Sequence, residues 1–491
     1  MLKPTHGHSI FAVIPLTVIT AFASASIGQT RSETGQIELR PCPVPGTQEQ
    51  MLCGTYEVFE NRAKQSGRKL ALNIAVLPAR NKSPEPDPIF WITGGPGDGA
   101  ARWAAYYYDS WLRQSRDLVM VDQRGTGESN PLICDLPGSA SNPQGYLDPA
   151  FKKLAPIRRC RNQLRKTADL KWYSTPTAMD DLDEVRQALG YDQINIYGVS
   201  YGSRAALVYA RRHAGAVRTL LLSGIAPISY TAPLYHARGA QRALELILAE
   251  CAADSQCSTA YPNVANEFNT VLDRLTQQPA MVTIADPHTG APVEVALTRA
   301  AFADSLRTMM YNSARSRWVP YLIHLAFQGD PASFADFLAT RNRYVRESAL
   351  GLLLSVTCPE DVARIDAKQI PAETDGTFFG DGRVRQQGNA CRVWPQAQLP
   401  ANFGDPIESD VPVLMWSGQQ DPVTPPEWGE RAAENLPNSL HAVVPGAHSS
   451  LTLLDTDCFR TVSSRFLDKG SVRGLNTRCA NRIKLPPWEI H

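Results

Sequence analysis

A serine lies between two glycines where an apolar run gives way to a helical pattern. The run Ile194–Tyr197 leads into Gly198-Val199-Ser200-Tyr201-Gly202, and the helical pattern then covers Ser203–His213. Gly-x-Ser-x-Gly at a strand-to-helix junction forms a tight turn that raises the serine hydroxyl above the sheet edge and points a helix N-terminus at it. The pattern alone is weak and a structural turn is the alternative, but the junction predicts that Ser200 is a nucleophile.

A serine hydroxyl is a poor nucleophile unless a histidine takes its proton and an acid orients that histidine. After a turn of this kind, the chain order is serine, acid, histidine. His448 lies in a loop just past the last predicted strand, and Asp421 lies in the loop that follows the predicted strand Val413–Ser417. An aspartate before proline is also common in turns, which is the alternative for Asp421. The order and placement predict a triad of Ser200, Asp421 and His448.

Such a triad needs two backbone N–H groups that stabilise the oxyanion of the intermediate. One is expected from Tyr201, which follows the nucleophile, and the other from the loop after the third strand. That loop has the sequence Gly94-Gly95-Pro96-Gly97, and we expect the amide of Gly95 to be the second donor. Neither the Walker pattern nor Gly-x-Gly-x-x-Gly is present, which argues against a nucleotide-phosphate site.

Short apolar strands that alternate with helices must position these residues. This alternation predicts the α/β class, with a mostly parallel sheet of about eight strands and helices on both faces. A helix is predicted over Thr177–Leu189, with Thr177 as its N-cap. The predicted strands are Tyr56–Asn61, Leu70–Leu77, Ile89–Thr93, Asp117–Asp122, Ile194–Tyr197, Thr219–Ser223, Val413–Ser417 and Leu440–Val444.

Helical patterns dominate residues 235–404, and strand signals return after Pro412. We therefore predict a mainly helical cap at 235–404, inserted between two parts of the core at 26–234 and 405–491. A separate trailing domain is the alternative, and the returning strands argue against it.

The N-terminus has the pattern of a removable signal. An apolar run over Ile10–Phe22 precedes Ala23-Ser24-Ala25, so residues 1–25 are predicted to be a signal peptide, with an uncleaved anchor as the alternative. The net charge is +1 and no basic tract is present, so the sequence indicates no nucleic-acid partner. We expect a secreted or periplasmic protein with no stable membrane association after removal of the signal.

Ten cysteines agree with export, because an even count in an exported chain favours disulfides. Free thiols or a metal site are the alternatives, but no Cys-x-x-Cys and no zinc-finger spacing occurs. Connectivity is not fixed by sequence. Short separation favours neighbours, and the pairs predicted on that ground are Cys42–Cys53, Cys134–Cys160, Cys251–Cys257, Cys358–Cys391 and Cys458–Cys479.

Five stretches between about Gln50 and Cys479 carry a family resemblance. They are Thr93-Gly94-Gly95-Pro96-Gly97, Asp122-Gln123-Arg124-Gly125-Thr126-Gly127-Glu128-Ser129, Gly198-Val199-Ser200-Tyr201-Gly202, Asp421-Pro422-Val423-Thr424-Pro425 and Gly446-Ala447-His448. Together they resemble the exported α/β-hydrolases related to prolyl iminopeptidase and the Streptomyces tripeptidyl aminopeptidases. Prolyl iminopeptidases typically have a histidine at the position of Thr93, so the chain is more similar to the tripeptidyl group.

The resemblance implies an exopeptidase that binds the free N-terminus of a peptide through acids near the cap. The matching stretch is Cys358-Pro359-Glu360-Asp361, in which Glu360 is the preferred candidate and Asp361 the second. A solvated acidic turn is the alternative for both acids. The expected enzyme is a serine aminopeptidase that needs no metal or organic cofactor. An esterase or amidase on the same fold, or a binding protein on an inactive scaffold, are the alternatives.

Overall fold

The computed structural model describes residues 37–448 and 456–491. The predicted signal peptide at 1–25 lies outside the described residues. Among the described helices, none combines the length and apolar character needed to cross a membrane.

The described part of the chain contains a nine-stranded sheet in the order β1-β2-β3-β5-β4-β6-β7-β10-β11. The pairs β1–β2, β2–β3 and β3–β5 are antiparallel. All pairs in the rest of the sheet, from β5 through β4, β6, β7 and β10 to β11, are parallel. The strands are β1 (Arg40–Pro43), β2 (Gln50–Phe59), β3 (Lys69–Leu77), β4 (Ile89–Ile92), β5 (Leu118–Val121), β6 (Ile194–Val199), β7 (Val217–Ser223), β10 (Val413–Gly418) and β11 (Ser439–Val444).

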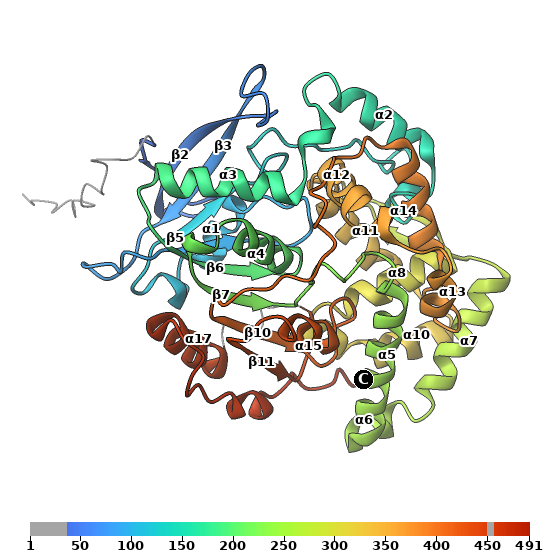
Figure 1. Cartoon of the computed structure of the whole chain (residues 1–491). Coiled ribbons are helices and arrows are strands. Elements are labelled where there is room, and N and C mark those ends of the chain that lie inside the picture. The colour runs from blue at the N-terminus through green and yellow to red at the C-terminus, as the bar shows by residue number, and fades with distance from the viewer. Residues whose placement is uncertain (1–36, 449–455) are drawn as a thin grey trace, which may run out of the picture.

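Helices cover both faces of this sheet (Figure 1). Buried side chains of α3 and α4 pack with Ile74, Phe90 and Ile196 on one face, and those of α1 and α17 pack with Tyr197 and Trp416 on the other. The core helices are α1 (Ala104–Tyr107), α2 (Leu154–Leu164), α3 (Thr175–Ala188), α4 (Tyr201–Arg212), α15 (Pro426–Ala433) and α17 (Asp457–Lys469). This is the α/β-hydrolase arrangement that the sequence predicts.

A long insertion separates β7 from β10, and it has its own hydrophobic core (Figure 1, light green to orange). It is mainly helical, as the sequence predicts, but it also contains an antiparallel hairpin of β8 (Ala280–Ala285) and β9 (Pro292–Leu297). Its helices are α5 (His236–Ala253), α6 (Ser255–Ala260), α7 (Val264–Gln277), α8 (Arg299–Met309), α9 (Ser313–Ser316), α10 (Val319–Gln328), α11 (Ala332–Arg346), α12 (Leu350–Glu360), α13 (Gln369–Thr374) and α14 (Gly382–Val393).

One strand was missed and one local prediction was wrong. The edge strand β1 was not predicted, because four residues containing two prolines give no strand pattern. Helix α3 begins at Thr175, so Thr177 lies inside the helix and is not its N-cap. Pro176, at the second helical position, is the start signal that the prediction overlooked. Backbone N–H groups in the first turn of a helix have no acceptor within the helix, and proline has no N–H to leave unpaired.

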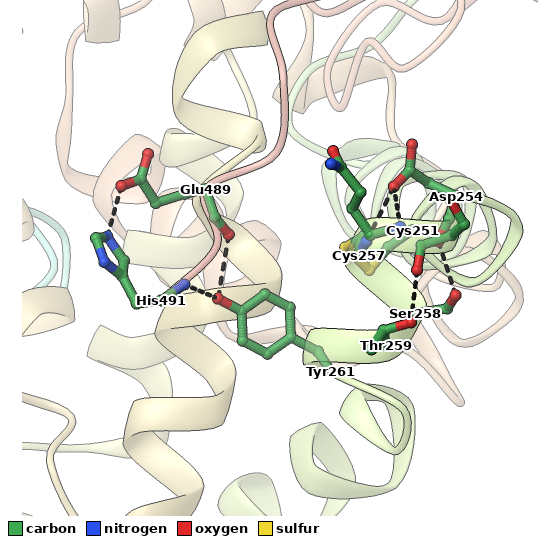
Figure 2. Close-up of a disulfide and its surroundings, with 10 residues drawn as sticks. Cys251, Asp254, Cys257, Ser258, Thr259, Tyr261, Glu489 and His491 are labelled. Atoms are coloured by element: carbon green, nitrogen blue, oxygen red, sulfur yellow. Dashed lines mark hydrogen bonds and ion pairs between the residues drawn. A yellow bond between two sulfur atoms is a disulfide. The ribbon is translucent and has the colours of Figure 1, made fainter.

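All ten cysteines are paired, and the five disulfides join the pairs that short sequence separation favours. Cys251–Cys257 closes the turn between α5 and α6, where Asp254 accepts hydrogen bonds from the amides of Gln256 and Cys257 (Figure 2). Beside it, the hydroxyl of Tyr261 donates to the carbonyl of Glu489, which fastens the C-terminal segment to the insertion (Figure 2).

The Asp122-Gln123-Arg124 segment after β5 is structural. Asp122 accepts hydrogen bonds from the amides of Ala101 and Glu128, at 2.9 and 3.0 Å, and so fixes the chain that follows the glycine-rich loop. Arg124 is fully buried and makes a two-point ion pair with Asp181 of α3, at 2.6 and 2.8 Å. The segment thus locks α3 and the glycine-rich loop against the same end of the sheet.

Candidate active site

Ser200 sits in a strained turn between β6 and α4. Its backbone has φ +56° and ψ −122°, a region that non-glycine residues rarely occupy. Both flanking glycines are sterically required: a Cβ on Gly202 would lie 2.1 Å from the carbonyl oxygen of Ile92, and one on Gly198 would lie 2.4 Å from that of Gly202. Backbone strain of this kind collects at functional sites, and here it presents the hydroxyl at the N-terminus of α4.

Three side chains from separate segments form one hydrogen-bonded chain. Nε2 of His448 lies 3.0 Å from Oγ of Ser200, and Nδ1 of His448 lies 2.7 Å from Oδ2 of Asp421. Asp421 follows β10 and His448 follows β11, so parallel strands bring both to the edge at which β6 ends. The geometry suits proton transfer from the serine to a histidine that the carboxylate orients.

Asp421 is fully buried, and its local contacts hold it as a carboxylate. Its oxygens accept from the amides of Val423 and Thr424, at 2.7 and 2.8 Å, and from the hydroxyl of Thr424 at 2.9 Å. Burial by itself raises the pKa of Asp421, but His448 and these hydrogen bonds outweigh it, so the pKa is lowered. The acid therefore keeps its charge beside the histidine.

The predicted oxyanion donors, Gly95 and Tyr201, both line the space beside Ser200. Among the described residues, no backbone or side-chain acceptor takes up either amide. A Cβ on Gly94 would lie 3.1 Å from Cβ of Ser200, so the absence of side chains lets this loop approach the nucleophile. The arrangement leaves two N–H groups free for a developing negative charge.

A cavity of about 830 Å³ lies above the serine. The core contributes Gly95, Ser200 and His448 to its wall, and the insertion contributes residues such as Arg307 and Arg383. This volume is in the range of pockets that bury small molecules.

The two candidate acids have different places in the wall. Asp361 lines the cavity and makes a buried ion pair with Arg204, at 2.7 Å. Glu360 is fully buried but is not among the lining residues, and its two oxygens accept from the amide and hydroxyl of Thr175, at 2.6 and 2.7 Å. The hydroxyl of Thr175 also shares a hydrogen bond of 2.8 Å with that of Tyr201. Glu360 thus holds Thr175, which in turn contacts the side chain of Tyr201, and Asp361 is the acid that faces the cavity.

Several residues at the site were not predicted. Thr424 contacts both Asp421 and His448, and its position three residues after an aspartate is the usual signal of a side-chain-capped turn. Tyr311 packs edge-on against His448, with 5.2 Å between ring centroids, and nothing in the local sequence indicates this. Over residues 37–448 and 456–491, no group of three His, Cys, Asp or Glu side chains could hold a metal ion.

Comparison with known families agrees with this geometry. Residues 87–259 match the α/β-hydrolase fold family, and residues 376–479 match the family described as TAP-like protein. Together the two matches place the chain among the α/β-hydrolases, and its C-terminal part resembles the TAP-like family. The chain is a serine hydrolase of this fold.

Curated relatives of this serine hydrolase include peptidases. The chain is 24% identical to serine protease Hip1 of Mycobacterium tuberculosis, over 90% of this chain and 91% of that protein. It is 26% identical to tripeptidyl aminopeptidase of Streptomyces lividans, over 41% and 40% of the two chains. It is 30% identical to a probable proline iminopeptidase of Streptomyces coelicolor, over 29% and 34%.

Proposed function

We propose that this protein is a serine exopeptidase that hydrolyses peptide bonds near a free N-terminus. The observation that supports this most is a buried carboxylate, Asp361, in the wall of the cavity that contains Ser200 and His448. The relatives that act as a serine protease and as a tripeptidyl aminopeptidase support the same proposal.

In the proposed reaction, Ser200 attacks the scissile carbonyl while His448 takes the hydroxyl proton. Asp421 orients His448 and stabilises its cation, and the amides of Gly95 and Tyr201 stabilise the oxyanion. His448 then protonates the leaving amine. Water, activated by His448, resolves the acyl-enzyme and restores the free serine.

The α-ammonium of the substrate would lie beside Asp361. Burial raises the pKa of this carboxyl even though Arg204 lowers it, so the ionised form is incompletely compensated. A substrate cation would stabilise that form, and the attraction is stronger in a site from which water is excluded. Glu360 would act indirectly, by fixing Thr175 and Tyr201. In this proposal the insertion at 235–404 is a cap that closes the non-primed side.

The proposed location is secreted or periplasmic, through a signal peptide at residues 1–25. Five disulfides support it, because such bonds persist mainly outside the cytoplasm.

The test uses one series of peptides in two forms, with a free N-terminal amine and with an N-acetylated one, and a simple ester as a third substrate. The cleavage of each is measured for the wild type and for Ser200→Ala. We expect the free-amine peptides to be cleaved about 100-fold or more faster in kcat/KM than the acetylated ones, as for a buried charge pair that loses one partner. Ser200→Ala should cleave none of them. Equal cleavage of free and acetylated peptides, or cleavage of the ester alone, would replace the exopeptidase with an amidase or esterase.

A further inference from the structure

The cavity wall carries an excess of positive charge. Among the described residues, seven Lys and Arg side chains line it, against four Asp side chains. Three of the seven cations pair with a carboxylate: Arg204 with Asp361 at 2.7 Å, Lys152 with Asp148 at 2.7 Å, and Arg341 with Asp304 at 3.8 Å. Of the other four, Lys153 and Arg315 are exposed. The remaining two are arginines of the insertion, Arg307 on α8 and Arg383 on α14.

Arg307 and Arg383 have no carboxylate partner among the residues that the structure describes. Arg307 is buried and donates from Nη1 to the hydroxyl of Tyr311 at 2.6 Å, while its Nε has no hydrogen-bond partner. Arg383 makes no ion pair or hydrogen bond with any other described residue, and its Nε is likewise buried without a partner. Its guanidinium instead stacks over the ring of Phe151, 4.7 Å from the centroid.

The two cations are close enough to affect each other. Burial and then the charge of Arg307 lower the pKa of Arg383 to about 10, although Asp304 and Tyr311 act in the opposite direction. The neighbouring His236 is also buried, and its pKa is lowered by burial and then by Arg307 and Arg383, so it stays neutral and adds no further positive charge. Asp304 is the carboxylate that acts on Arg383, but it also lies 3.8 Å from Arg341, so three arginines face one carboxylate. Such an excess of desolvated positive charge is unfavourable in a folded protein.

This cationic pair belongs to the catalytic end of the cavity. The guanidinium of Arg307 lies 5.3 Å from the ring centroid of Tyr311, and that ring lies 5.2 Å from the ring of His448. One aromatic side chain therefore separates Arg307 from the catalytic histidine. An anionic group held there would belong to the same molecule whose bond is cleaved at Ser200.

We propose that Arg307 and Arg383 form a binding site for a carboxylate of the substrate. The proposal rests on the peptidase function proposed above and adds the substrate class: peptides with a carboxylate within reach of the cleaved bond. Guanidinium groups bind carboxylates through paired, charge-assisted hydrogen bonds, and the bound anion would relieve the repulsion between the two cations. The carboxylate is that of an acidic side chain or the C-terminal α-carboxylate of a short peptide.

Matched peptides distinguish the two sources. One arm uses a C-terminally amidated alanine tetrapeptide with a free amine, in which Glu or Gln replaces each alanine in turn. The other arm uses the all-alanine tetrapeptide as its acid or its amide. In at least one pair, the wild type should prefer the carboxylate by about 10- to 100-fold in kcat/KM, which is the usual effect of a hydrogen bond to a charged group.

Variants on one helix then test the residues. Arg383→Met should bring the preferred pair to a ratio near one, and Arg383→Lys should keep part of the preference because the charge remains. Arg385→Met is the control: this arginine is on the same helix, is exposed, and pairs with Asp381. It should keep the wild-type ratio. A wild-type ratio near one in every pair, or an unchanged ratio in Arg383→Met, would overturn the proposal.

Binding decides the arginine site without turnover. The same pairs are titrated into Ser200→Ala by calorimetry, and we expect tighter binding of the carboxylate member, which Arg383→Met in that background should abolish. If this binding holds while the wild type cleaves no peptide, the peptidase function fails and the carboxylate site stands. If cleavage holds without any binding preference, the carboxylate site fails alone.

Discussion

Ser200, Asp421 and His448 come from three distant segments and meet through two short hydrogen bonds. Much of this arrangement follows from local sequence. The glycines around Ser200 are required by contacts within one turn, and the loops that carry Asp421 and His448 begin where short apolar strands end. The order of the residues along the chain then selects this histidine and this aspartate.

Replacement of Asp421 by asparagine tests the orientation of the histidine. The amide would preserve shape but remove the charge that stabilises protonated His448, so kcat should fall on the order of 10^4-fold, with a much smaller change in KM. Asp410→Asn, at an exposed position before β10, is the control and should keep wild-type kinetics. A loss below tenfold in Asp421→Asn would show that the acid is dispensable.

Glu360 makes stability depend on pH. Burial raises its pKa to about 7 from an ordinary value of 4.5, although the hydrogen bonds from Thr175 and the charge of Arg204 act in the opposite direction. Between these pH values the unfolded chain has released the proton and the folded chain still holds it. The free energy of unfolding should therefore fall as pH rises from about 4.5 to 7, by an amount on the order of 3 kcal/mol, and then level off.

Urea unfolding of Glu360→Gln measures this contribution. The glutamine cannot ionise, so the difference in unfolding free energy between wild type and variant should shift in favour of the variant across that window. Glu434→Gln, at an exposed site, should follow the wild type. A difference between wild type and Glu360→Gln that does not change with pH would mean that Glu360 is ionised throughout.

The preference for Glu360 as the acid that faces the substrate came from the resemblance, and the structure instead lines the cavity with Asp361. The sequence shows two adjacent acids, but which one points outward depends on where α12 ends and how it packs on α3. Arg307 and Arg383 were not predicted for the same reason. They come from α8 and α14, which are far apart in the chain, and only the tertiary structure brings them near each other.

At the scale of elements, the inner strands of the parallel sheet were predictable because each is a short apolar run buried on both faces, whereas the edge strand β11 is only partly buried. The hairpin β8–β9 and the edge strand β1 lack that signal. β8 alternates buried and exposed residues inside a segment in which helical patterns dominate, and β1 is mostly exposed. Their pairing partners, rather than their own composition, determine them.

The disulfide Cys358–Cys391 fastens two helices that carry proposed site residues. It joins α12, which bears Glu360, to α14, which bears Arg383, and it spans 33 positions, whereas Cys251–Cys257 spans 6. Chain entropy predicts that a longer loop contributes more stability. Removal of Cys358–Cys391 by paired alanine substitutions should cost about 4 kcal/mol, against about 2 kcal/mol for Cys251–Cys257.

Urea unfolding of the two double variants checks this order. We also expect the first variant, and not the second, to lose its preference among the peptides, since only the first bond joins helices that carry proposed site residues. Equal losses of stability in the two variants, or a reversed order, would show that the unfolded-state loop is not the source of the stabilisation.

At the scale of the whole molecule, neither the core nor the insertion forms the cavity alone. The sheet edge supplies the nucleophile and its partners, and the insertion supplies Arg307 and Arg383. The C-terminal segment returns to the insertion through Tyr261 and Glu489 (Figure 2). The site thus depends on the folded chain as a unit, which explains why motifs near the serine indicate the reaction while the substrate preference depends on packing.

The central claim is that Ser200 is the nucleophile of a hydrolase. The direct measurement is covalent labelling with a fluorophosphonate, followed by peptide mapping by mass spectrometry and a parallel assay of turnover. We expect one adduct per chain, on Ser200, with loss of turnover in proportion to labelling and no adduct in Ser200→Ala. An adduct on a different serine, or full turnover by protein completely labelled at Ser200, would contradict the account.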